Sequence, residues 1–460
     1  MSIGTQSSQH PVAADHAVPW WAEITRYQWT VLLMTWLGFL FDLMDSTLYT
    51  MVMGPALQDL LGPAASVQNI GWYGGLIFSM FLVGWALGGI VFGILVDYVG
   101  RKRTLMITIL IYAVFTGLAG LAGSWWELGA YRFLTGLGVG GEWAAGAAIL
   151  AETWPERARA KGAAILQTSA GMGYLAAAFI YLLVGGYGWR LVFLAGALPA
   201  VLLFFVRKTI RESERWMATQ HGDVGTVRGC EGATVRGASD GATVRRFSGA
   251  SRFTLVEIFE RRLRRDTLVG SALASIANFG FWGVSAWVPV LIQNRIAADP
   301  SLAAGASVSS YVSYAIMVLT LGSLPGYALV AVLADWWGRK AMFVVFFTGA
   351  ALSAPMIFLG PWTLSQMLLL LPFLGFFTLG IYAGFPIYLL ELFPTHLRTT
   401  GAGFCFNIGR VVSAAGPFLT GVVVLYTGSF EYAISALSGV YLLGPVMLLF
   451  ARETKGQLLL

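Results

Sequence analysis

The sequence predicts an all-α integral membrane protein whose twelve transmembrane helices form two pseudo-symmetric bundles of six. Three observations lead to this prediction: the composition, the spacing of the apolar segments and an internal duplication. Of the 460 residues, 57% are hydrophobic and only 11% are charged, whereas charged residues make up about 25% of a typical soluble domain. A chain of this composition belongs in a lipid bilayer.

Apolar segments long enough to cross a membrane follow one another along the chain. A hydrocarbon core of about 30 Å needs roughly 20 apolar residues per helix. The predicted spans are 28–53, 72–96, 104–123, 127–151, 160–184, 189–207, 266–293, 308–334, 341–360, 364–390, 399–427 and 431–451. They divide the chain into an N-terminal segment (1–27), a six-helix bundle (28–207), a polar loop (208–265), a second six-helix bundle (266–451) and a tail (452–460).

Two motifs occur once in each half. The segment GILVDYVGRK at 93–102 returns as AVLADWWGRK at 331–340, with its aspartate 238 positions further on. The pattern ExxPxxxRxxG at 152–162 returns at 391–401, an offset of 239. Two unrelated motifs with nearly the same offset indicate that the half-chain is duplicated. Duplicated bundles of apolar helices are typical of secondary transporters.

The basic residues predict the orientation in the membrane. With these boundaries, 25 of the 29 lysines and arginines fall on one side, and an excess of positive charge marks the cytoplasmic side. We therefore expect a multi-pass protein of the inner cell membrane with both termini in the cytoplasm. Residues 1–27 show no signal peptide pattern. The 208–265 loop, with its repeated GATVR, is expected to be a flexible linker.

Three carboxylates lie within predicted spans. Asp42 and Asp45 are on the first span and Glu142 is on the fourth. A charge at the centre of a bilayer costs at least about 2.5 kcal/mol, so such residues usually face a watery cavity or an opposite charge. We expect Asp42 and Asp45 to face a central cavity and at least one of the three carboxylates to carry protons. The alternative is a structural ion pair.

Basic and amide side chains occur at similar depths. Arg410 lies about 18 Å into its span at 1.5 Å per residue, near the expected level of Asp42 and Asn278. A guanidinium group binds a carboxylate through two hydrogen bonds, which favours an anionic substrate. Alternatively, Arg410 pairs with Asp42 or Glu142 without contacting a ligand.

Further residues are candidates for the same substrate site. Arg132 is expected near the level of Asp45, where it could either pair with that carboxylate or bind substrate. The full set of predicted substrate-binding residues is Arg410, Asn407, Asn278, Arg132, Tyr388 and Trp282. Most aromatic side chains in membranes serve packing or interface anchoring, and this is the alternative for Tyr388 and Trp282.

Several functional classes are excluded. The sequence contains no metal-ligand cluster, nucleophile arrangement or phosphate-binding loop, so we expect neither an enzyme nor a bound cofactor, with protons as the coupling ion. The net charge of +6 follows membrane topology rather than nucleic-acid binding. Cys230 and Cys405 fall in the loop and in a span, and no disulfide is expected. The expected partners are a small organic anion, protons and lipid, and the chain is expected to be a monomer.

The duplicated motif at 93–103 and 331–340 resembles the loop signature of the major facilitator superfamily, and the resemblance covers essentially the whole chain. It implies the major facilitator fold and a cytoplasmic gate of ion pairs that break and re-form in each cycle. The matching gate residues are Asp97, Arg101, Arg103, Glu152 and Arg159 in the first half and Asp335, Arg339, Glu391 and Arg398 in the second. Ala331 replaces the glycine of the signature.

Within that superfamily, the sequence is most similar to the sialate:proton and carboxylate:proton symporters. The segments GVGGEW at 138–143, AETWP at 151–155 and FDLMD at 41–45 carry this resemblance. It implies proton-coupled import of a small organic anion, such as lactate or sialic acid, by alternating access. The tail sequence ETKG at 453–456 is similar to sugar porters, which leaves a proton-coupled sugar or polyol porter as an alternative. A nutrient sensor that does not transport is the alternative from another class.

Overall fold

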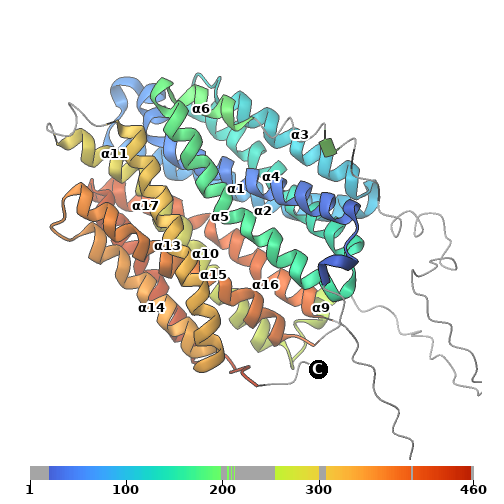
Figure 1. Ribbon diagram of the computed structural model, residues 1–460. Helices are drawn as coiled ribbons and strands as arrows, with labels where there is room; N and C mark the ends of the chain where they lie inside the picture. Colours follow the sequence, from blue (N-terminus) through green and yellow to red (C-terminus); the bar gives the residue numbers. More distant parts are fainter. Residues whose placement is uncertain are drawn as a thin grey trace, which may run out of the picture.

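The computed structural model describes residues 20–197, 205, 206, 209, 212, 254–299, 307–394 and 397–456, and these residues fold into helices packed in two groups (Figure 1). The first group contains α1 (Arg26–Leu61), α2 (Val67–Val99), α3 (Arg101–Ala119), α4 (Trp125–Thr153), α5 (Glu156–Val184) and α6 (Trp189–Gly196). The second contains α10 (Arg264–Ser285), α11 (Val288–Ala298), α13 (Val308–Trp336), α14 (Arg339–Phe358), α15 (Leu364–Leu392), α16 (Arg398–Ser413), α17 (Ala415–Thr427), α18 (Phe430–Ser438) and α19 (Leu443–Leu448). Short 3-10 turns and α9 (Thr254–Glu257) connect them.

Among the described residues, ten helical segments are long and apolar enough to cross a membrane. The fourth predicted span is α4, whose 29 residues would extend about 43 Å at 1.5 Å per residue. The sixth is described as α6 up to Gly196 with its C-terminal residue Ala197, and 198–204 lie outside the described part of the chain. Most of the predicted 208–265 loop also lies outside that part. The predicted all-α membrane fold is confirmed, although the description of its twelve crossings is incomplete.

Equivalent helices of the two halves pack through equivalent glycines. Where α2 meets α4, a side chain at Gly84 would collide with the backbone oxygen of Phe133. Where α13 meets α15, a side chain at Gly322 would collide with the backbone oxygen of Pro372. Small residues allow helix backbones in a membrane to approach closely. The duplication in the sequence therefore appears again as a duplicated packing contact.

The predicted spans 266–293 and 399–427 are each broken into two helices. The first break separates α10 from α11 at Ala286 and Trp287, just before Pro289. The second separates α16 from α17 at Ala414, just before Pro417. Proline lacks the N–H that continues a helix and clashes with the preceding turn. These breaks were not predicted from the apolar windows, which read each span as one helix.

The motif loops between Val99 and Arg101 and between Trp336 and Arg339 lie at the same end of the molecule, called here the basic end. Across the opposite half, hydrogen bonds join the two bundles. The Ser79 hydroxyl donates to the carbonyl of Ala414 at 2.6 Å, and the Gln293 amide donates to the carbonyl of Met51 at 2.7 Å. The bundles are therefore held together in the half away from the basic end.

Candidate functional site

A cavity of about 100 Å³ lies between the two bundles. Helices α1, α2 and α5 form one wall, and α10, α13, α15 and α16 form the other. Its lining residues are Phe39, Leu43, Trp85, Gln167, Ala170, Tyr174, Asn278, Phe281, Trp282, Tyr327, Leu379, Tyr382, Phe406 and Arg410. Gln167 is exposed and lies on the part of α5 that leads to the basic end. The cavity is therefore reached from that end.

Arg410 is the charged residue in this lining. Its guanidinium carbon lies 5.3 Å from the ring centre of Trp85 on α2 and 5.2 Å from that of Phe406 on α16. Such cation–π contacts stabilise a cation that has been withdrawn from water. Arg410 thus sits at the junction of the two bundles, and the structure brings it together with two other predicted site residues, Asn278 and Trp282.

Asn278 is buried beside Arg410 in the lining. Its side-chain amide donates to the carbonyl of Ala274 at 2.8 Å, and its oxygen accepts a hydrogen bond from the Tyr382 hydroxyl at 3.2 Å. These bonds fix the orientation of Asn278 and Tyr382. From its span, Tyr382 could be expected to line the cavity, but it was left out of the predicted substrate-binding set because nothing in its local sequence distinguishes it from other membrane aromatics.

The two α1 carboxylates do not line the cavity, so the expectation that they face it is wrong. Phe39 and Leu43, four residues apart, form the cavity face of α1. Asp42 and Asp45 are fully buried and turn toward α3 and α4 inside the first bundle. Asp42 directly precedes Leu43, and one residue along a helix turns the side chain by about 100°, so sequence spacing alone does not identify which face of α1 meets the cavity.

Asp45 and Arg132 form a closed ion pair. The two guanidinium nitrogens of Arg132 lie 3.1 Å and 2.8 Å from the two carboxylate oxygens of Asp45, and the Thr116 hydroxyl donates to Asp45 at 2.7 Å. Arg132 is also 4.5 Å from the ring centre of Phe81. Both charged side chains are completely buried. Of the two possibilities for Arg132, the geometry supports pairing with Asp45, away from the cavity.

Asp42 faces Glu142 of α4, and Tyr112 of α3 is a neighbour of both. Both carboxyl groups are buried, and the hydrogen bonds of the described residues leave their oxygens without a donor. The Glu142 carboxyl occupies the space that a side chain at position 38 would fill, so Gly38 is needed for this arrangement. Two buried carboxylates in contact repel one another when both are charged.

Two of the predicted substrate residues lie elsewhere. Tyr388 is buried at the basic end of α15, where its hydroxyl donates to the carbonyl of Arg452 at 3.0 Å. It cannot contact a ligand in the cavity from that position. Asn407 lies one turn from Arg410 toward the basic end, is exposed, and donates to the carbonyl of Gly403. It is outside the cavity lining.

The predicted gate residues of the second half are grouped at the basic end. Arg339 donates to both oxygens of Glu391 at 3.0 Å and 2.7 Å and lies 3.7 Å from Asp335. Arg398 is half-buried and is the first residue of α16, seven positions after Glu391 in the chain. In the first half, Arg101 donates to the carbonyl of Val96 and Arg103 is exposed. The side chains of Asp97, Glu152 and Arg159 lie outside the described part of the structure.

Each motif loop is bound by one glutamate that was not among the predicted gate residues. Glu212 accepts hydrogen bonds from the backbone N–H groups of Arg101 and Lys102. Glu453 accepts equivalent bonds from Arg339 and Lys340 at 2.9 Å and 3.0 Å. A carboxylate at a helix N-terminus satisfies N–H groups that have no partner within the helix. The sequence contains a pattern that could have identified both glutamates, because an Arg-Glu pair follows each predicted six-helix bundle.

The fold and the cavity together define a membrane transporter: two duplicated bundles enclose a small site near the middle of their spans. The model of the Major Facilitator Superfamily matches residues 35–417, and the chain belongs to this family of transporters. It is a multi-pass membrane protein and not an enzyme.

Relatives with transport functions cover nearly the whole chain. The niacin transporter NiaP of Acinetobacter baylyi is 28% identical over 446 residues, which cover 95% of this chain and 96% of the relative. The sialic acid transporter NanX of Escherichia coli is 28% identical over 415 residues, which cover 90% of this chain and 91% of the relative. The crystal structure of a D-xylose-proton symporter matches with a TM-score of 0.70 at 18% identity, over 94% of this chain and 99% of that one. The structural likeness shows the shared fold.

Proposed function

We propose that this protein imports a small organic anion together with a proton, by alternating access to the central cavity. The observation that supports this proposal is the placement of Arg410 in the cavity with the Asp42–Glu142 pair behind the wall of the first bundle. The cavity thus holds a permanent positive charge, and a titratable site lies nearby.

The substrate carboxylate binds Arg410. A guanidinium group offers parallel N–H donors that match the two oxygens of a carboxylate, and burial between Trp85 and Phe406 strengthens the attraction by excluding water. The named substrates of the two relatives, niacin and sialic acid, both carry a carboxylate. An organic acid therefore fits both the charge of the site and the chemistry of these relatives.

The proton binds the Asp42–Glu142 pair. Asp45 is fully engaged by Arg132 and Thr116, whereas Asp42 and Glu142 face one another without a cation between them. The field of Asp42 also acts on Arg410. A substrate anion at Arg410 reduces the positive field at Asp42, which favours protonation of the pair, and this links the two binding events.

The positions of the contacts between the bundles suggest how the cavity opens to each side in turn. The structure is joined across the half away from the basic end, and we propose that the basic end faces the cytoplasm. The Arg339–Glu391 group and its first-half counterpart then close the cytoplasmic side in the other state. The Arg339 and Glu391 side chains are 14% and 17% exposed, so water can reach both charges when the pair breaks in each cycle.

Uptake into proteoliposomes tests this proposal. Labelled organic acids, including lactate, N-acetylneuraminate and benzoate, are supplied with and without an inward proton gradient to wild type, Arg410→Ala and Asp42→Asn. We expect gradient-driven uptake in wild type, no uptake by Arg410→Ala, and no response to the gradient by Asp42→Asn. Arg262→Ala, which removes an exposed arginine before α10, is the matched control. Gradient-independent accumulation by wild type would exclude proton coupling.

The sugar or polyol alternative is tested in the same assay. A neutral sugar offers no charge for Arg410, so an excess of glucose should leave uptake of the acid unchanged. Glucose competition that survives Arg410→Ala would support the sugar porter. Absence of any uptake despite ligand binding would support the non-transporting sensor.

A further inference from the structure

The walls of the central cavity are formed mainly by aromatic rings. Of the fourteen lining residues, eight are aromatic: Phe39, Trp85, Tyr174, Phe281, Trp282, Tyr327, Tyr382 and Phe406. They come from both bundles and from seven different helices. A ligand between the bundles would therefore touch rings on both sides.

These rings contact one another mostly edge to face. The ring centre of Trp282 is 5.0 Å from that of Phe281 and 6.2 Å from that of Trp85, with interplanar angles of 73° and 61°. Tyr382 meets Phe281 at 5.7 Å and 80°. In an edge-to-face pair, one ring keeps a face that is not covered by its partner. The cavity wall thus offers ring faces and edges to a flat ligand.

The polar groups of the lining are few. Asn278 and Tyr382 are joined to each other, and the Asn278 amide also donates to a backbone carbonyl. Besides these, the polar groups are the side chains of Gln167 and Arg410, the hydroxyls of Tyr174 and Tyr327, and the indole N–H groups of Trp85 and Trp282. A ligand with many hydroxyl groups would lose water without gaining an equal number of hydrogen bonds, which is unfavourable.

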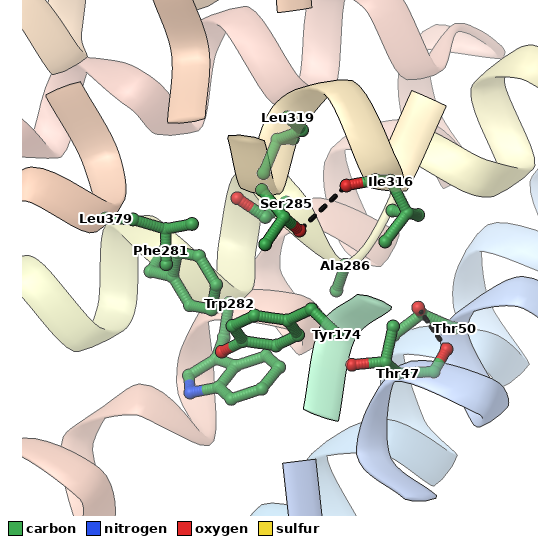
Figure 2. Close-up of a pocket in the computed structure, with 11 residues that line it drawn as sticks. Thr47, Thr50, Tyr174, Phe281, Trp282, Ser285, Ala286, Ile316, Leu319 and Leu379 are labelled. Carbon is green, nitrogen blue, oxygen red and sulfur yellow. Dashed lines mark hydrogen bonds between the residues drawn. The ribbon is translucent and has the colours of Figure 1, made fainter. Parts of the chain in front are cut away.

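A second pocket lies beyond the same rings, on the side away from the basic end (Figure 2). It has a volume of about 30 Å³ and shares Tyr174, Phe281, Trp282 and Leu379 with the central cavity. Figure 2 shows the three rings together on one side of this pocket, with Thr47 and Thr50 on the other. The rings therefore form the partition between the two spaces.

The hydroxyls of this second pocket do not compensate for the apolar lining. Thr47 donates to the carbonyl of Leu43, Thr50 to that of Thr47, and Thr320 to that of Ile316. These three threonine donors are used within their own helices, as is common for threonine in membrane helices, whereas the buried Ser285 hydroxyl has no hydrogen-bond partner among the described residues. A polyhydroxylated ligand would find few donors on either side of the partition.

We infer that the transported anion carries a flat unsaturated ring: its carboxylate binds Arg410, and its ring lies against Trp282, Phe281 and Phe406. This inference rests on the proposed function, because it assumes that Arg410 receives the substrate carboxylate. It identifies the substrate class as aromatic monocarboxylates rather than short hydroxy acids or polyhydroxylated sugar acids. Two favourable ring–ring contacts correspond to about a tenfold gain in affinity over an aliphatic ring of similar size.

A matched pair of ligands tests this inference. Benzoate and cyclohexanecarboxylate have the same carbon skeleton and the same carboxylate but differ in aromaticity. We expect wild type to bind benzoate about tenfold more tightly, as measured by calorimetry on the purified protein and by competition for uptake. In Trp282→Leu and Phe406→Leu the ratio should fall toward one, mainly through weaker benzoate binding. Phe373→Leu, which changes an exposed ring of α15 outside the cavity, should keep the wild-type ratio.

The outcomes separate this inference from the proposed function. Equal binding of the two ligands by wild type, or tighter binding of lactate or N-acetylneuraminate than of benzoate, would overturn the aromatic assignment and leave organic-anion transport standing. An unchanged ratio in both folded ring variants would overturn the placement of the ligand against these rings. Failure of Arg410→Ala to weaken binding of any carboxylate would instead overturn the proposed function itself. Thermal melting of each variant shows whether it has folded.

Discussion

The two bundles share one architecture but carry opposite charges in their interiors. The first bundle buries Asp42, Asp45 and Glu142 together with Arg132, whereas the second places Arg410 in the cavity wall. Packing contacts such as Gly84 against α4 have counterparts in the other half, but these charged groups do not. The duplication therefore accounts for the shared scaffold, whereas the buried charges differ between the two copies, and this difference is the basis of the proton site and the anion site proposed above.

Within the first bundle, a further contrast separates Asp42 from Asp45. Asp45 has a cation and a hydroxyl donor, while Asp42 has a second carboxyl group as its neighbour. The fully paired Asp45 carboxylate therefore joins α1 to α3 and α4 and stabilises the first bundle. The Asp42–Glu142 pair, which has no cation between its members, is the proposed proton site. The predictions below test this division of roles, beginning with the largest expected effect.

Loss of the Asp45 charge should destabilise the folded protein most strongly. Asp45→Asn leaves Arg132 as a buried cation without its carboxylate, and breaking a buried ion pair in this way costs about 3–5 kcal/mol. We expect a much lower yield and a lower melting temperature in detergent. Replacing both partners, as in Asp45→Asn with Arg132→Met, should recover part of the loss. Wild-type stability of the single variant would show that the pair is not structural.

Substitution of Arg410 by lysine should weaken substrate binding while leaving the fold intact. Lysine keeps the positive charge but lacks the planar fork that binds a carboxylate through two bonds and stacks between Trp85 and Phe406. We expect at least about a tenfold rise in the dissociation constant for the transported acid, since 1.4 kcal/mol corresponds to that factor. Calorimetry measures this change. Equal affinity would mean that charge alone recognises the substrate.

Asp42→Asn should separate proton coupling from substrate movement. An asparagine cannot carry the proton, but it can preserve the packing against Glu142. At an inward gradient of one pH unit, wild type should accumulate the acid about tenfold, and the variant should reach only equal concentrations on the two sides. Exchange of external for internal acid should continue in the variant. Gradient-driven accumulation by Asp42→Asn would assign the proton to another group.

The smallest effect is expected at the tail glutamate of the second bundle. Partial burial alone would raise the pKa of Glu453, but hydrogen bonds from the backbone N–H groups of Lys340, Arg339, Lys455 and Thr454 outweigh it and lower the pKa below its ordinary value. A lowered pKa means that the carboxylate stabilises the fold above its unfolded pKa of about 4.3 and loses this contribution as the pH falls through the folded value.

Glu453→Gln should therefore melt at a lower temperature than wild type at pH 7, and the two melting curves should converge as the pH is lowered below about 4. Melting in detergent over a pH series measures this difference. A difference in melting temperature that does not change with pH would show that the charge of Glu453 does not stabilise the basic end. Glu212→Gln, at the first motif loop, would show whether the two glutamates contribute equally to stability.

Much of the architecture could be predicted from local sequence. Apolar windows gave the positions of the spans, and the repeated motifs gave the two halves, because both signals depend on residues close together in the chain. The breaks before Pro289 and Pro417 were missed, since apolar windows do not register a change in helix direction. At the site, Arg410, Asn278 and Trp282 were correctly placed around one cavity, whereas Tyr388 was placed there wrongly because a window gives depth only approximately.

By itself, the sequence determined that this chain lies in a membrane, that it consists of two related halves, and which few charged residues lie within the spans. These properties follow from composition and periodicity, which a bilayer converts directly into helices. Only the tertiary structure decided which side of α1 meets the cavity, that Arg132 belongs to Asp45, and that Glu142 belongs to Asp42. Those pairings join helices far apart in the chain, and their geometry is set by close packing between helices.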